Sequence, residues 1–534
     1  MHTAGVIPAF LVAIAFSLPL VYIKVKNVRV FHGVAIAAAI SAFTLSLYVQ
    51  HYILSQGAPI VYRMGGWPPP LGIVYEVDAL SALLATYTAF TIVFIVAYSY
   101  WYLGDDPGVP YYYSLLLGVE AGLLGIYYTG DIFNLFVMLE VLSITCYGLV
   151  AYYRNSREAV EASFKYAFFG TIAGLLYFIA AVITYSSFGN LTMGFVAAYS
   201  RPLFRYFYQF IDLFTWGNIT GAVAAVAALS LWTFTFKAGV FPNHFWLPDA
   251  HPAAPTPISA VLSGLVVNAG AYASIRFLYT IFGVYDPLSI FYQLSQYFSI
   301  VLSVIGAISA VFASIMMLIQ RDAKRLIAYS TIMHLGLIFT GFSLGTLTGV
   351  KASVYHILTH AAGKALLFMS TGVAIEASRT RSIADLKAIG RLNPLVGVSV
   401  AISCFSLVGL PPLGGFFSKF TLYQAFIEAG RFDLVAILLF SSGIALLGYF
   451  KIIQPVLFGF PPSLNTSDIG RFRRTSLWAS LLPLLIVLVA LNPLVVEALL
   501  REAAESTLLA DKYISQAVKS FIDYVREVQL SSGG

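Results

Sequence analysis

Two charged residues interrupt apolar runs at positions where they can carry protons. Glu140 lies inside one run, and Lys237 lies toward the end of another. A charged side chain at the centre of a bilayer costs about 2.5–3.5 kcal/mol, so it needs a partner or a function. Opposite charges predict a pair, worth roughly 3 kcal/mol at about 5 Å and an effective dielectric constant near 20. That energy is large enough to change the protonation of Lys237 between the closed and the open pair, which is what a proton switch needs. The alternative is a static ion pair that fixes the packing of the two helices.

A second group of titratable residues shares one predicted helix face. His356, His360 and Lys364 follow one another at intervals of four residues, and His334 lies in the preceding apolar run. Residues four apart are neighbours on a helix, and histidine titrates near neutral pH, so such a file can relay protons together with water. Structural hydrogen bonding is the alternative. Without a carboxylate the set makes a poor metal site, and we expect no metal ligands.

Further polar residues lie in apolar runs. Lys419 follows a stretch rich in Pro and Gly, 409–415, and is a candidate relay to the far side of a membrane or a lysine that reaches the membrane surface. Glu120 is a second acid in an apolar run, for which proton access and simple pairing are both open. The basic residues in or at the edge of such runs are Lys165, Lys237, Arg276, Lys364, Lys419 and Lys451.

The scarcity of cysteines and the lack of a nucleotide-binding motif exclude several classes of function. The two cysteines, Cys146 and Cys404, lie in separate apolar runs and cannot form an iron–sulfur or thiolate metal site. No Gly-rich nucleotide fingerprint opens a strand–helix unit. We therefore expect no cofactor and no redox or hydrolytic centre in this chain. The net charge of +6 reflects loop topology, described below, rather than a nucleic-acid partner.

The elements that must position these residues are membrane helices. Hydrophobic residues make up 59% of the 534 residues and charged residues only 10%, against about 25% charged in a soluble protein. Apolar runs of helical length predict an all-α polytopic membrane protein with about fourteen spans. The predicted spans are 5–23, 30–49, 80–103, 111–129, 132–153, 162–186, 218–240, 257–282, 296–319, 326–345, 352–376, 395–427, 433–455 and 476–494.

The loops between these spans predict the orientation. Lys and Arg concentrate in the loops after odd-numbered spans, which places those loops in the cytoplasm and both termini outside the cell membrane. No Lys or Arg precedes the first run, so we expect that span to be retained rather than cleaved as a signal peptide. The segment 58–78 predicts an external β-hairpin, and 495–530 predicts an amphipathic helix that lies on the surface.

Interrupted helices suggest an internal duplication. The run with Lys237 is broken by Pro242, and the run with Lys419 by Pro411 and Pro412, five spans later. Paired broken helices in corresponding positions are typical of transporters built from inverted repeats. Four units are predicted. Residues 1–110 form the N-terminal helices 1–3 with the hairpin, and 111–282 form the first repeat (helices 4–8). Residues 296–455 form the second repeat (helices 9–13), and 476–534 form helix 14 with the tail.

Four stretches together carry a family resemblance, 129–140, 236–260, 356–364 and 409–419. The chain resembles the proton-translocating antiporter-like subunits of complex I, and is most similar to the D-type subunit of Mrp cation/proton antiporters and its counterpart in membrane-bound hydrogenases. The resemblance covers essentially the whole chain. It implies fourteen helices with two inverted five-helix repeats and with broken helices 7 and 12.

The resemblance also implies roles for individual residues. Glu140 on helix 5 pairs with Lys237 on helix 7, Lys419 on helix 12 exchanges protons with the other side, and His356, His360 and Lys364 on helix 11 connect the two halves. One position departs from the family pattern, because Asn268 stands where many relatives carry a lysine on helix 8.

The leading hypothesis is an ion-translocating subunit of a multi-subunit membrane complex that includes further antiporter-like subunits. It moves protons along the buried Glu, Lys and His residues, driven by an ion gradient or by a redox reaction in the partner subunits; whether Na⁺ is exchanged is left open. The alternatives are a stand-alone secondary transporter for an organic solute and a membrane scaffold without transport. A scaffold gains nothing from costly buried charges.

Overall fold

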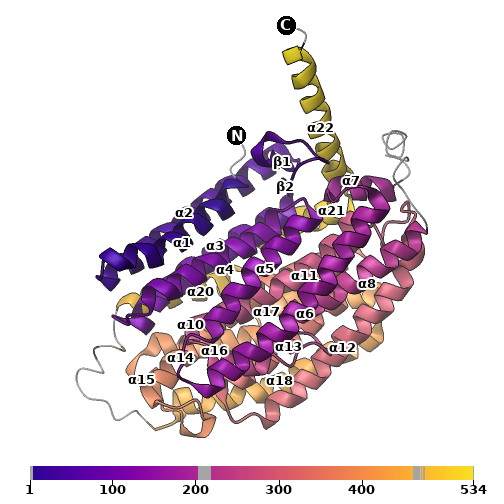
Figure 1. Ribbon diagram of the computed structural model, residues 1–534. Coiled ribbons are helices and arrows are strands. Elements are labelled where there is room, and N and C mark those ends of the chain that lie inside the picture. Colours follow the sequence, from indigo (N-terminus) through magenta and orange to yellow (C-terminus); the bar gives the residue numbers. More distant parts are fainter. Residues whose placement is uncertain (1–3, 202–217, 461–469, 471, 473–474, 533–534) are drawn as a thin grey trace.

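The computed structural model describes residues 4–201, 218–460, 470, 472 and 475–532. The described chain is a bundle of long helices with one small hairpin (Figure 1). Many helices begin where a side chain accepts a hydrogen bond from an unpaired backbone N–H, for example at Asp131, Ser156 and Asp322. The apolar runs and these caps together fix where the spans begin.

Twelve described helical segments are long and apolar enough to cross a membrane. One of them, Thr256–Ile281, joins α10 (Thr256–Val261), α11 (Val267–Ile275) and the π-helical turns η4 (Leu262–Val266) and η5 (Arg276–Ile281). The other eleven are α1 (Val6–Lys24), α2 (Val28–Gln56), α3 (Ala79–Leu103), α4 (Val109–Tyr128), α5 (Ile132–Val150), α6 (Arg157–Phe188), α8 (Ile219–Ala238), α12 (Ser295–Ile319), α13 (Ala323–Phe342), α14 (Leu347–Ser378) and α18 (Phe432–Phe458).

The remaining two predicted spans have interrupted counterparts. The region predicted as one span at 395–427 consists of α16 (Pro394–Val408) and α17 (Gly414–Glu428), separated by the Pro/Gly stretch. At the C-terminal side, α20 (Thr475–Ala490) and α21 (Pro493–Leu508) bend by 82°, and the bent pair counts as a thirteenth span. The polytopic all-α prediction is therefore confirmed, whereas the count of fourteen and the repeats stay predictions.

The predicted hairpin is present. Strand β1 (Ile60–Arg63) pairs antiparallel with β2 (Val74–Val77), with Ile60 opposite Val77. Tyr75 of β2 also forms a bridge to Thr129 at the end of α4. Figure 1 shows the hairpin at the same end of the bundle as α7 (Met193–Ser200) and the C-terminal helix α22 (Asp511–Ser532).

The C-terminal helix packs against α7 and against the hairpin. Residues of α22 alternate between polar and apolar at helical spacing, as predicted, and its first turns pack through Ile514 and Val518 against Ala197 and Ala198 of α7. Its later turns extend beyond the end of the bundle in Figure 1 and contact the hairpin, where Glu527 forms an ion pair with Arg63 of β1 at 3.1 Å. Amphipathic spacing identifies an apolar face but not the surface that this face meets.

One ion pair fastens the hairpin end of the bundle. The two terminal guanidinium nitrogens of Arg276 donate to the Asp78 carboxylate at 2.7 Å, and both side chains are buried. Asp78 also caps α3 by accepting from the Ser81 N–H. Burial raises the pKa of the Asp78 carboxyl, but the charge and hydrogen bonds of Arg276 outweigh burial and hold this pKa below its ordinary value. Arg276 thus has a structural partner outside the predicted proton file.

This pair gives a prediction for stability. Arg276→Leu leaves the Asp78 carboxylate buried without a counter-charge, which costs about 3–5 kcal/mol of unfolding free energy. We expect a clearly lower thermal unfolding midpoint for the purified protein. The double variant Asp78→Asn, Arg276→Leu keeps a helix cap without a buried charge and recovers most of the loss. An unchanged midpoint in Arg276→Leu would show that the pair does not stabilise the fold.

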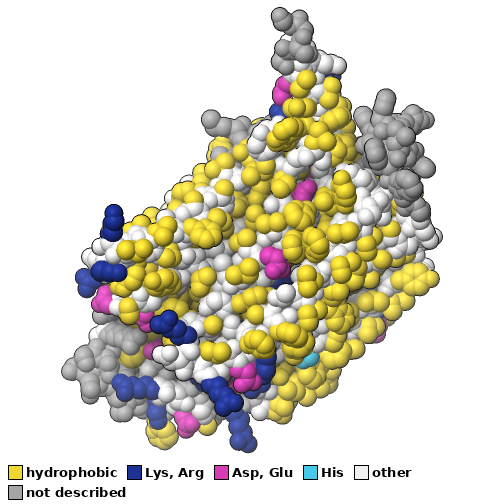
Figure 2. Space-filling model, viewed as in Figure 1, with side chains coloured by type: hydrophobic (Ala, Val, Ile, Leu, Met, Phe, Trp, Pro, Cys, Tyr) yellow, Lys and Arg dark blue, Asp and Glu magenta, His cyan; other side chains and the backbone are white. Residues whose placement is uncertain are grey.

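Basic side chains concentrate at the opposite end of the bundle. Figure 2 shows Lys and Arg at the end away from the hairpin and a mostly hydrophobic flank between the two ends. Several of these residues form ion pairs between elements: Lys165 and Arg325 both contact Asp249 of α9 (Leu247–Ala253), and Arg381 contacts Glu158. This end is called the basic end below.

Candidate functional site

Lys237 is buried near the end of α8. It is 1% exposed and lies in the last turn, because α8 ends at Gly239, whose φ of 65° favours glycine. The ammonium group donates to the Ser143 hydroxyl of α5, and that hydroxyl donates to the Leu139 carbonyl. The helix break therefore places the lysine against the middle of α5.

Glu140 lies on the same helix as the serine that Lys237 contacts. The predicted direct ion pair is not formed between these described residues: Lys237 bonds to Ser143, and Oε1 of Glu140 has no hydrogen-bond partner among them. Glu140 packs on Gly174 of α6 so closely that a methyl group there would collide with the carboxylate. Ser143 lies one turn from Glu140, so the partner of Lys237 and the carboxylate are neighbours on α5.

Lys364 is fully buried at the centre of the bundle. Its ammonium group donates to the Ser330 hydroxyl and, at 3.2 Å, to the Ile327 carbonyl, both on α13. The same nitrogen lies 5.8 Å from the centre of the Tyr449 ring of α18. Lys364 thus connects α14 to the two helices that pack beside it.

The histidines form a continuous hydrogen-bonded file beside Lys364. The Tyr449 hydroxyl bonds His334 Nε2 at 3.1 Å, His334 Nδ1 bonds His356 Nε2 at 3.0 Å, and His356 Nδ1 bonds the Ser418 hydroxyl at 2.9 Å. His360 packs on His334 with ring centres 5.5 Å apart, and neither of its ring nitrogens has a partner among the described residues. The file crosses from α18 through α13 and α14 to α17.

Lys419 follows Ser418 directly and lies against the helix break. Its ammonium group donates to the Val408 carbonyl at 3.0 Å and to the Ser442 hydroxyl of α18 at 2.8 Å. The Val408 carbonyl is free to accept because α16 ends there, at Gly409 with φ 97°. The broken helix therefore supplies part of the lysine's binding site.

The three lysines share one kind of environment. Each donates to a serine hydroxyl on a neighbouring helix, Ser143, Ser330 or Ser442, and none forms an ion pair with a described carboxylate. A hydroxyl accepts a hydrogen bond from an amine as well as from an ammonium group, so it does not fix the charge of its partner. Such lysines are suited to gaining and losing protons.

Asn268 occupies the position that the resemblance assigns to a lysine. It is 2% exposed, its amide donates to the Gly264 carbonyl at 2.6 Å, and its Oδ1 has no partner in the described chain. The π-helical turn η4 immediately precedes α11, and π-turns occur often at functional sites. Glu120 of α4 is likewise fully buried, with neither carboxyl oxygen bonded to a described residue.

The turn after α8 lies at the basic end. Asp249 contacts Lys165 at 3.5 Å and Arg325 at 3.3 Å, whereas the His251 ring is fully buried and stacks on Phe368 of α14. Burial lowers the pKa of His251 well below its ordinary value, with Lys324 and Lys364 adding to the effect. A neutral imidazole at this position packs like an aromatic ring, consistent with a structural role for the turn.

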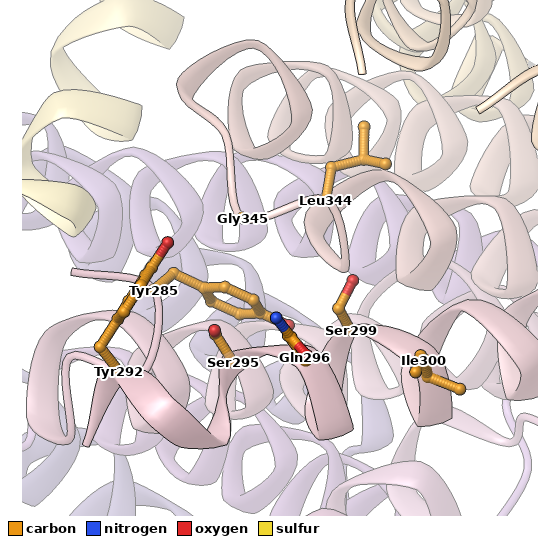
Figure 3. A pocket seen from close by; sticks show the side chains of 8 residues that line it. All are labelled: Tyr285, Tyr292, Ser295, Gln296, Ser299, Ile300, Leu344 and Gly345. Carbon is orange, nitrogen blue, oxygen red and sulfur yellow. The ribbon is translucent and has the colours of Figure 1, made fainter. Parts of the chain in front are cut away.

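A separate cavity of about 370 Å³ lies at the hairpin end (Figure 3). Tyr285, Tyr292 and Gly345 line it together with hydroxyl, amide and aliphatic side chains of α12, and no Asp, Glu, Lys, Arg or His is among its lining residues. The cavity does not include the lysine and histidine file.

Sequence reasoning missed the partners of the site residues. Tyr449 and the serines Ser143, Ser330, Ser418 and Ser442 were not predicted, although Ser143 lies three residues after Glu140 and Ser418 directly precedes Lys419. Hydroxyls at these spacings from intramembrane charges are a usable signal. Tyr449 and Ser330 lie far in sequence from Lys364, which they contact, and gave no such signal.

A family model matches more than half of the chain. The model describes the transmembrane part of NADH:quinone oxidoreductase and Mrp antiporter subunits and matches residues 129–445. The chain belongs to this family. The match includes the whole set of candidate residues from Glu140 to Lys419 and confirms the resemblance seen in the sequence.

Individual relatives span most of the chain. The N-type subunit of NADH-quinone oxidoreductase from Desulforudis audaxviator is 33% identical over 451 residues, which is 84% of each chain. The D-type subunit of the Na⁺/H⁺ antiporter from Bacillus subtilis is 26% identical over 92% of this chain and 95% of its own.

Solved structures share the fold. A chain of the membrane-bound sulfane sulfur reductase, an archaeal respiratory membrane complex, superposes with a TM-score of 0.83 at 28% identity, covering 97% of this chain and 100% of its own. A chain of the Mrp complex from Dietzia gives the same TM-score and coverage at 24% identity. These neighbours are chains of multi-subunit membrane complexes.

Proposed function

We propose that this protein is an ion-translocating subunit of a multi-subunit membrane complex and that protons move along its buried lysines and histidines. The observation that carries the proposal is the hydrogen-bonded file Tyr449–His334–His356–Ser418, which ends beside Lys419. Imidazoles and hydroxyls in direct contact can exchange protons with water and with a neighbouring lysine. The relatives named as Na⁺/H⁺ antiporter and quinone oxidoreductase subunits support cation or proton transport.

The first half of the path is a switch made by Glu140 and Lys237. In the structure the lysine rests on Ser143, which is the open position of the pair. Closing the pair gains roughly 3 kcal/mol at about 5 Å and an effective dielectric constant near 20, which favours the charged lysine. Opening it returns the lysine to a hydroxyl partner and allows it to pass its proton toward Lys364.

The helix breaks support two inverted repeats as the frame of this path. Both α8 and α16 end at a glycine with positive φ, Gly239 and Gly409, and each break is followed by proline. We propose that α4–α11 and α12–α18 are the two repeats, each placing one lysine at its break. Lys364 and His360 on α14 then lie between the two half-channels.

The charge distribution supports an orientation in the cell membrane. Lys and Arg concentrate at the basic end, which favours a cytoplasmic location for that end. The hairpin and both termini then face outward. The partner subunits, among them further antiporter-like subunits, carry out any electron transfer or couple the ion gradient that drives transport.

Variants of Lys419 distinguish two roles for this residue, a proton relay and a structural cation. A relay needs a group that titrates, whereas a structural cation needs a positive charge. We expect Lys419→Glu to retain several times the ion flux of Lys419→Ala when both are assayed in sealed vesicles that contain the complex. Lys451 provides the matched control, because its ammonium group binds the Leu318 and Gln320 carbonyls outside the file. Equal loss in both Lys419 variants would favour a structural charge.

A further inference from the structure

A cavity of about 780 Å³ opens at the basic end, where α12 and α18 terminate. A large part of its lining comes from the connection between α14 and α16. The lining residues are Gln320, Arg321, Ser382, Ile383, Ala384, Leu386, Lys387, Lys451, Gln454, Pro455, Phe458, Gly459 and Phe460. Three of them are basic and none is acidic, so the cavity attracts anions.

Two of the three basic side chains have no partner in the described chain. Arg321 is exposed and Lys387 is half-buried, and neither forms a side-chain hydrogen bond or ion pair with a described residue; their backbones are held by Ile383 and by the Ser378 hydroxyl. Lys451 is held differently, because it donates to the Leu318 and Gln320 carbonyls at 2.6 Å. In the described chain, Lys451 is therefore held in place, whereas Arg321 and Lys387 are available to bind an anion.

The cavity continues onto an apolar surface. Ile319 at the end of α12 is 64% exposed, and Phe458 at the end of α18 is 68% exposed. Leu318 and Phe450 extend the exposed surface along the same two helices. Both helices are membrane-spanning segments that end at this cavity, so charged and apolar surfaces meet where the lipid head groups lie.

We propose that this cavity binds the head group of an anionic phospholipid, with the acyl chains lying along α12 and α18. Basic pockets between transmembrane helices bind such head groups. The phosphate of a zwitterionic lipid carries its own cation and gains less from Arg321 and Lys387. A volume of about 780 Å³ lies within the usual range for a bound small molecule.

A bound lipid would also connect parts of the second half of the bundle. The lining residues 382–384, 386 and 387 belong to the connection between α14, which carries Lys364 and the two histidines, and α16, which ends at the break beside Lys419. Asp385 of this connection is not among the lining residues. The lipid thereby holds this connection against α12 and α18. This assignment does not depend on proton transport by the chain.

The test compares lipid binding between matched variants of the full chain in its complex. Phosphatidylglycerol and phosphatidylcholine are titrated separately in detergent, and bound lipid is counted by native mass spectrometry. The cavity variant is Arg321→Gln, Lys387→Gln, and the control is Lys24→Gln, Lys26→Gln, which removes the basic residue that ends α1 and the one in the following loop. Thermal unfolding of each variant verifies that it is folded.

We expect one tightly bound phosphatidylglycerol in the parent and the control, and about thirtyfold weaker binding in the cavity variant. Phosphatidylcholine should bind weakly to all three. Parent-like binding of phosphatidylglycerol by the cavity variant would overturn the proposal, as would equal affinity for the two lipids. Cross-linking from position 387 to another subunit in place of lipid would overturn it in favour of a protein interface.

Discussion

We expect Lys237→Ala to reduce ion translocation by about a hundredfold while the complex remains assembled. In the proposed switch, Lys237 leaves its Ser143 partner to pair with Glu140, and alanine removes this group, so no proton can be held at the break of α8. The helix itself should tolerate the change, because alanine has the highest helix propensity. The measurement is pH-driven or redox-driven flux in sealed vesicles that contain the whole complex.

Variants of α5 separate the switch from general damage. Glu140→Ala should lose as much flux as Lys237→Ala, since it removes the other partner, and Glu140→Asp should be milder because it keeps the carboxylate. Ser143→Ala should have an intermediate effect, because it removes the open position of the lysine but not the pair. Normal pumping by an assembled Lys237→Ala complex would show that the pair is not the switch.

The second large effect concerns the bridge between the two halves. We expect Lys364→Ala or His360→Ala to remove most of the flux and Asn268→Ala to remove little. A neutral amide cannot store a proton near neutral pH, whereas a lysine held by the Ser330 hydroxyl can. His360 lies against His334 with unpaired ring nitrogens, so it is placed to pass a proton to the file. Vesicle flux under the conditions used for Lys237 measures each variant.

Asn268→Lys serves as the informative companion variant. Among the described residues the amide donates to Gly264 of the same span, so a lysine replaces no bond to another described helix and should be tolerated, as the family resemblance also implies. Severe loss in Asn268→Ala beside near-normal flux in Lys364→Ala would place the bridge on the helix of Asn268 instead.

The sequence predicted those features whose physical signal is local. An apolar run of about twenty residues identifies a span in any context, and proline with glycine identified the breaks near Lys237 and Lys419 because these residues end helices wherever they occur. Two short runs of β-branched and aromatic residues on either side of a Gly/Pro stretch predicted the hairpin for the same reason. Charge inside an apolar run singled out the candidate lysines and histidines, since its cost does not depend on the partner.

Features that depend on packing between distant segments were not predicted. Nothing local indicates that Tyr449 meets His334, or that Ser442 accepts from Lys419. The opposite charges of Glu140 and Lys237 predicted a direct pair, whereas the structure holds the lysine one turn away, on Ser143. The sequence predicted that the span 476–494 ends where a surface helix begins, but not the 82° angle between α20 and α21, because the angle depends on what each half packs against.

The central claim is that protons cross the membrane along the buried lysines of this chain. The most direct measurement is the internal pH of sealed vesicles that contain the complex, with the chain either unchanged or carrying Lys237→Ala, Lys364→Ala and Lys419→Ala together. The account predicts a pH change in the first case and only passive leak in the second, with all subunits present in both. A pH change at the parent rate in the triple variant would contradict it.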